Sequence, residues 1–188
     1  MISASMAALV CLVLGTAPAV AHADAKAGEK KAQLCLLCHR AENPPAYIPT
    51  LEGQTREYLL NQIKAFKERR RDNLAMQINT ASLSVKDMRD IADYFASRKP
   101  VRGSFPLDEA KASRGKARVA ALKCAACHRD DYSGNKEVPR LAGVEPRYLA
   151  PQMIAFAEGK RAHPPFEGMR QLSPEDAEDL AQYFAQLQ

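Results

Sequence analysis

The sequence predicts an all-α protein built from two tandem copies of one helical domain. Long segments recur at an offset of about 90 residues: LCLLCHR returns as KCAACHR, and LSVKDMRDIADYFA returns as LSPEDAEDLAQYFA. Apolar residues in each copy fall at helical spacing, and no stretch alternates as a β-strand would. Because the sequence and its helical period repeat together, we expect one domain design used twice.

Four regions follow from N- to C-terminus. Residues 1–23 contain no Asp, Glu, Lys or Arg and end in Ala-His-Ala, a small-x-small cleavage pattern, which predicts a signal peptide and export. Residues 24–99 and 107–188 are the two predicted domains. The segment between them, 100–106, contains two prolines and a glycine that interrupt the helical pattern, so we interpret it as a linker.

Three helices are expected in each domain, and the last is the clearest. Ser84 and Ser173 stand at N-cap positions with an Asp three residues on, and a helical apolar stripe follows each of them. A second amphipathic helix precedes the capped one, and a further helix leads into each cysteine motif. The apolar residues of the second helix are Leu59, Ile63 and Phe66 in one copy and Leu149, Met153 and Phe156 in the other.

The repeated motif is CxxCH. Its two cysteines stand at i and i+3 and its histidine at i+4, so all three project from nearly one helix face. Two thioethers and one axial nitrogen can then reach a single flat macrocycle, and CxxCH is the attachment signature of c-type haem. We therefore predict two covalently bound haems, held by Cys35, Cys38 and His39 and by Cys124, Cys127 and His128.

Other uses of the motif fit less well. A thioredoxin-like disulfide would accompany a βαβ pattern, which the sequence lacks. A tetrahedral zinc site needs four ligands, and neither copy offers a fourth Cys or His at finger spacing. Two chance matches in corresponding places of a repeat are improbable, so haem is favoured.

The sixth position of each iron is the next question. Met76 lies in the polar segment RRRDNLAMQINTASLS, where packing explains it poorly, and it is our candidate ligand for the first haem. Met88 and Met153 lie on core stripes and are assigned to packing. In the second copy Met169 is favoured and His163 is the alternative, which would make that haem bis-histidine and lower its potential.

Further residues are placed to contact the haem or its ligands. Pro49 and Pro139 follow the ligating histidines by about ten residues, where a backbone carbonyl can accept the second imidazole N–H. Candidate contacts to the haem propionates are Tyr58, Tyr148, Arg71 and Arg161.

The formal net charge of +5 favours an acidic partner or an anionic membrane surface. The alternative is that basic residues offset acidic groups on the cofactor. Nucleic acid is not expected as a partner, because the chain carries an export signal and no recognition motif.

These motifs resemble the di-haem class I cytochromes c, cytochrome c4 most closely, over nearly the whole predicted mature chain. The resemblance rests on CLLCH and CAACH, on PTLEGQTREYLLNQIKAF and PRLAGVEPRYLAPQMIAF, and on the LS and YFA that follow. It implies two cytochrome c-like domains, each built around one covalent haem with His and Met ligands. It also implies a periplasmic electron carrier with redox partners such as a terminal oxidase, a bc-type complex or a periplasmic dehydrogenase, free or peripheral to the inner membrane.

The chain departs from the family pattern at three positions. Arg40 and Arg129 follow the ligating histidines where the family usually has Gly, and Val144 stands where the first copy has Gln54. The second copy also has no methionine at the position matching Met76, which leaves Met169 less secure as a ligand. For that reason a second function is kept beside the first: a haem enzyme or enzyme subunit whose second haem is open or weakly ligated and acts on a small molecule. We favour the electron carrier, because few side chains suited to acid or base catalysis lie near the second motif.

Overall fold

The computed structural model describes residues 25–39, 45–163 and 167–187. These residues form helices and loops, with one isolated bridge between Asn135 and Val138, so the all-α prediction is confirmed. No helix in the described ranges combines the length and the apolar character needed to span a membrane. The predicted signal peptide, 1–23, and Arg40 lie outside the described residues.

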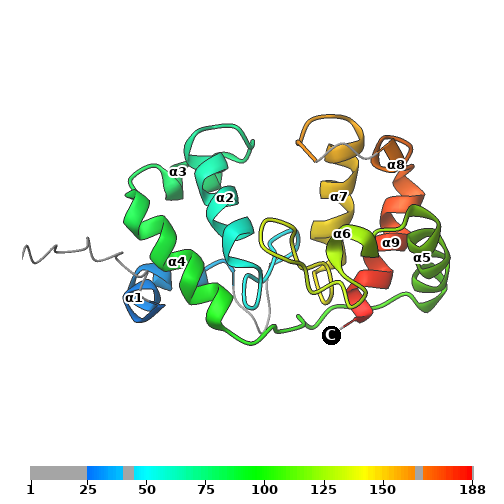
Figure 1. The fold of residues 1–188 in the computed structure, drawn as a ribbon, viewed down its shortest axis with the longest axis horizontal. Helices are drawn as coiled ribbons and strands as arrows, with labels where there is room; N and C mark the ends of the chain where they lie inside the picture. The colour runs from blue at the N-terminus through cyan, green and yellow to red at the C-terminus, as the bar shows by residue number, and fades with distance from the viewer. Residues whose placement is uncertain (1–24, 40–44, 164–166, 188) are drawn as a thin grey trace, which may run out of the picture.

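The helices form two lobes that lie side by side, with α2 and α7 facing each other across the middle (Figure 1). The first lobe contains α1 (Ala25–Leu36), α2 (Arg56–Lys67), α3 (Leu74–Thr80) and α4 (Val85–Ser97). The second contains α5 (Glu109–Leu122), α6 (Ala125–His128), α7 (Pro146–Ala157), α8 (Glu167–Arg170) and α9 (Pro174–Gln186). The three helices expected in each copy are present. α3 and α8 were not predicted, because helices this short carry no periodic signal. α6 covers the second CxxCH motif, whose spacing had already indicated helical backbone there.

The helices α4 and α9 begin at the serines that the sequence indicated. The hydroxyls of Ser84 and Ser173 accept from the backbone N–H three residues on, and Asp87 and Asp176 complete both capping boxes. Both caps satisfy N–H groups that the first helical turn leaves without partners. The caps therefore fix where the most deeply buried helix of each lobe begins.

Each lobe has an apolar core of its own. Leu59, Ile91 and Phe95 are buried in the first, and Leu149 and Phe184 are among the buried residues of the second. The two methionines assigned to packing are also buried: Met88 is 4% exposed and Met153 is 7% exposed. The cores hold α1 against α4 and α5 against α9, which positions the CxxCH motif at the end of α1 in one lobe and around α6 in the other.

Candidate haem-binding sites

The two motif histidines have the same backbone partner in both lobes. His39 Nδ1 lies 2.8 Å from the Pro49 carbonyl oxygen, and His128 Nδ1 lies 2.9 Å from that of Pro139. A carbonyl can only accept, so Nδ1 carries the proton and donates. The Nε2 lone pair is then left free, as a haem iron ligand requires.

Burial favours the neutral form of both imidazoles. His39 is 8% exposed, and its burial lowers its pKa, although the hydrogen bond to Pro49 acts in the opposite direction. Burial also lowers the pKa of His128, the bond to Pro139 raises it, and nearby His163 lowers it further. A neutral imidazole is the protonation state that binds a metal.

The four motif thiols are free. Cys35 and Cys124 are half-buried, whereas Cys38 and Cys127 are exposed, and none forms a disulfide. Burial raises the pKa of Cys35 and raises the pKa of Cys124 to about 11. Unpaired thiols beside a histidine with a free Nε2 are the arrangement that thioether attachment of a c-type haem requires.

Met76 lies in the first turn of α3. The side chain of Asn73 caps this helix by accepting from the Met76 N–H at 2.9 Å. Met76 is half-buried, while its helix neighbours Leu74 and Ile78 are 71% and 66% exposed. Exposed apolar side chains beside a candidate thioether ligand fit contact with a large apolar cofactor. The Asn73 cap is a local signal of this helix that the sequence analysis did not use.

The second lobe offers two candidate ligands in different surroundings. Met169, on α8, packs against the apolar core of its lobe. The His163 ring meets the Phe156 ring edge-on, with centroids 5.1 Å apart, and lies close enough to His128 to affect its pKa. Residues 164–166, between the two, lie outside the described residues, and Met169 remains our prediction with His163 as the alternative.

The four candidate propionate contacts come together at the boundary between the lobes. Arg71 donates to the Tyr148 hydroxyl at 2.9 Å, and Arg161 donates to the Tyr58 hydroxyl at 2.8 Å. Both bonds join residues of different lobes, so the interface carries two arginine–tyrosine pairs related by the internal repeat.

Two glutamines that the sequence analysis missed complete this network. The guanidiniums of Arg71 and Arg161 each donate to the side-chain oxygens of both glutamines, at distances of 2.7 to 2.9 Å. Each guanidinium also lies over a phenylalanine ring of its own lobe. The partners are Gln62 and Gln152, with Phe66 under Arg71 and Phe156 under Arg161.

The network places positive charge among neutral groups. All the hydrogen-bond partners that the described residues give Arg71 and Arg161 are uncharged, and burial raises the pKa of the Tyr58 phenol. Two half-buried guanidiniums without a carboxylate favour an anionic group beside them. Haem propionates have that charge, so the site fits the predicted contact.

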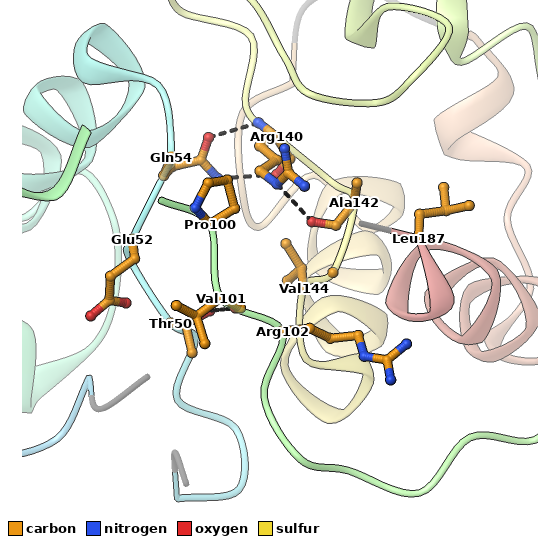
Figure 2. Close-up of a pocket in the computed structure, with 11 residues that line it drawn as sticks. Thr50, Glu52, Gln54, Pro100, Val101, Arg102, Arg140, Ala142, Val144 and Leu187 are labelled. Carbon is orange, nitrogen blue, oxygen red and sulfur yellow. Dashed lines mark hydrogen bonds between the residues drawn. The ribbon is translucent and has the colours of Figure 1, made fainter. Parts of the chain in front are cut away.

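A second contact between the lobes involves Gln54. Its side-chain amide donates to the Arg140 carbonyl at 3.0 Å and accepts from the Arg140 N–H at 2.6 Å (Figure 2). A cavity of about 200 Å³ adjoins this contact, and its walls include Thr50, Val101 and Val144. The two lobes therefore meet through directed polar contacts beside an incompletely filled space.

Comparison with known proteins identifies similar chains. The family model for subunit III of cbb3-type cytochrome c oxidase matches residues 110–184. The chain is 36% identical to cytochrome c4 of Pseudomonas aeruginosa over 81% of this chain and 81% of that protein. It is 28% identical to the thiosulfate dehydrogenase electron acceptor of Thiomonas intermedia over 84% of this chain and 78% of that protein.

A solved structure is similar over the same range. The crystal structure of reduced recombinant cytochrome c4 from Pseudomonas stutzeri superposes with a TM-score of 0.77 at 33% identity, and the match covers 88% of this chain and 99% of that one. The similarity therefore includes both lobes and their arrangement.

Proposed function

Because this chain belongs to the cytochrome c4 family, we propose that it carries electrons between redox partners in the periplasm. It is a c-type cytochrome with two haems, one for each CxxCH motif. The observation that carries the proposal is the duplicated arrangement of free CxxC thiols beside a histidine whose Nδ1 donates to a proline carbonyl. Each haem supplies a one-electron redox couple.

The residues of the chain hold and orient the cofactors. In this proposal the four cysteines form the thioether links, while His39 and His128 bind the irons through Nε2. Met76 is the sixth ligand in the first lobe. The carbonyls of Pro49 and Pro139 fix the tautomer and the orientation of the two imidazole rings.

The interface network supports transfer between the two lobes. Arg71 and Arg161 each bind side chains of both lobes, so the lobes are held in one arrangement. We propose that the same guanidiniums face the propionates. An electron could then enter at one lobe and leave at the other without a large domain motion.

Charge supports an acidic partner for the first lobe. Residues 24–99 contain 14 basic and 10 acidic residues, whereas residues 107–188 contain 12 of each. The excess positive charge therefore belongs to the first lobe and would steer a negatively charged redox protein toward it. The similarity to a thiosulfate dehydrogenase electron acceptor supports a periplasmic dehydrogenase as one such partner.

The first experiment is a haemochrome spectrum of the denatured protein, purified after export. We expect two covalently bound haems per chain, and absence of covalent haem would overturn the proposal. Stopped-flow reduction by an acidic redox protein should then slow as ionic strength rises. A rate independent of salt would refute steering by the first lobe.

An enzymatic role remains the second candidate. Its motive is that Met169 packs against the core, while the second lobe has no methionine at the position matching Met76. A high-spin ferric spectrum from the unmodified protein would favour an open second haem and this role. Two low-spin haems would favour the carrier.

A further inference from the structure

One peptide group of the second lobe takes part in two hydrogen bonds, one within its own lobe and one to the first lobe. The carbonyl of the Pro139–Arg140 peptide accepts from His128 Nδ1 at 2.9 Å, and the N–H of the same peptide donates to Gln54 Oε1 at 2.6 Å. Gln54 lies in the loop before α2, in the other lobe, and its Nε2 also donates to the Arg140 carbonyl (Figure 2). A first-lobe side chain is thus bonded to the peptide that orients a second-lobe histidine.

The internal repeat supplies a natural comparison. In the first lobe the equivalent peptide is Pro49–Thr50, and its carbonyl accepts from His39 Nδ1 at 2.8 Å. The residue equivalent to Gln54 is Val144, whose side chain has no hydrogen-bond acceptor. Thr50 and Val144 both line the 200 Å³ cavity. Among the described residues, therefore, the second-lobe histidine has this connection to the other lobe and the first-lobe histidine does not.

The connection has an electronic consequence. An amide whose N–H donates a hydrogen bond is polarised, and its carbonyl becomes a better acceptor. A better acceptor draws the Nδ1 proton of the imidazole more strongly, which increases the basicity of Nε2 toward a metal. A more basic Nε2 on His128 would stabilise ferric over ferrous iron in a bound haem and so lower its reduction potential.

We propose that Gln54 is a positioning residue for His128, through which the first lobe lowers the potential of the second haem. The inference rests on the proposed ligation of that haem by His128. It assigns the difference between Gln54 and Val144 a role in making the two haems unequal. The peptide amide carries the effect, and Gln54 touches neither the imidazole nor the cofactor.

The test replaces Gln54 by its natural counterpart. In Gln54→Val we expect the redox equilibrium of the second haem to shift toward the reduced form by several-fold, with the first haem unchanged. A tenfold shift corresponds to about 59 mV for one electron. Redox titration followed by NMR measures both haems, and the Nδ1 proton of His128 reports the strength of its hydrogen bond directly.

Two further variants separate polarisation from simple loosening of the interface. Gln54→Glu keeps an acceptor for the Arg140 N–H and adds negative charge, so the potential of the second haem should fall below that of the unmodified protein. Val144→Gln places an amide in the cavity beside Thr50, and the potential of the first haem should fall instead. If Gln54 had a purely structural role, Gln54→Val and Gln54→Glu would shift the potential of the second haem in the same direction.

The outcomes distinguish this inference from the proposed function. The inference is wrong if Gln54→Val leaves both the potential of the second haem and the His128 Nδ1 proton signal unchanged. It is also wrong if the variant shifts the potentials of both haems equally. Fewer than two covalent haems would instead overturn the proposed function. A urea unfolding curve for each variant confirms that the titrated protein is folded.

Discussion

Gly28 in α1 lies directly against the backbone of Asp90 in α4: a Cβ atom added at Gly28 would be 2.0 Å from the Asp90 carbonyl oxygen. Gly115 and Asp179 repeat this contact between α5 and α9, where the corresponding distance is 2.1 Å. Both crossings hold the helix that leads into a CxxCH motif against the capped C-terminal helix of its lobe. The position of each motif therefore depends on a glycine.

Replacing Gly28 by Ala should destabilise the protein. The methyl group cannot be accommodated beside a backbone carbonyl, so α1 must move from α4, and overpacking of this kind costs about 1–3 kcal/mol. Urea unfolding of the haem-loaded protein measures the loss. Gln33→Ala, at an exposed position of the same helix, is the control and should unfold at an unchanged urea concentration. Equal midpoints for both variants would contradict the close crossing.

Asp87 should make stability depend on pH. Hydrogen bonds from Lys31 and then from Ser84 hold the pKa of this carboxyl far below 3.8, its ordinary value. A carboxyl with a lowered folded-state pKa stabilises the fold above its unfolded pKa and loses that contribution as pH falls through the range below about 4.

We therefore expect Asp87→Asn to be less stable than the unmodified protein at pH 7, with the difference shrinking toward pH 3. Thermal unfolding between pH 3 and pH 7 gives the comparison. Glu137→Gln, on an exposed loop of the second lobe, removes one negative charge without touching a capping box. A difference that stays constant across the pH range would exclude a contribution from the Asp87 carboxylate.

Met76→Ala should remove one methionine–iron absorption signature from the ferric spectrum and leave the other haem unaffected. Because a thioether ligand favours ferrous iron, the potential of the first haem should fall. Met88→Leu is the matched control, since Met88 is buried in packing and conservative core changes of this kind cost less than about 1.5 kcal/mol. Loss of the signature in Met88→Leu but not in Met76→Ala would reverse the two assignments.

Met169→Ala and His163→Ala together identify the second sixth ligand. If Met169 binds the iron, Met169→Ala removes the remaining methionine signature and His163→Ala preserves it. If His163 binds, its replacement converts a low-spin haem to a high-spin one and Met169→Ala leaves the spectrum unchanged. Electron paramagnetic resonance of the ferric protein separates these patterns.

Much of the fold could be predicted from the sequence, because its signals are local. Ser84 and Ser173 cap helices through bonds to residues three positions away, and the apolar stripes of α4 and α9 repeat within a few turns. Helices of seven residues or fewer span at most two turns, so the apolar spacing within them is too short to reveal a helical period. The helix α3, which Asn73 caps, is one of these short helices.

By itself, the sequence determined the chemistry of each site. The spacing of Cys35, Cys38 and His39 places two thiols and one imidazole on nearly one face of the chain, and the same spacing recurs at Cys124, Cys127 and His128, because neighbours in sequence are neighbours on a helical turn. The tertiary structure alone decided how the two lobes are joined. Gln54 and Arg140, like Arg71 and Tyr148, are far apart in sequence and meet only where the lobes join, so no local spacing could indicate that one lobe supports the histidine of the other.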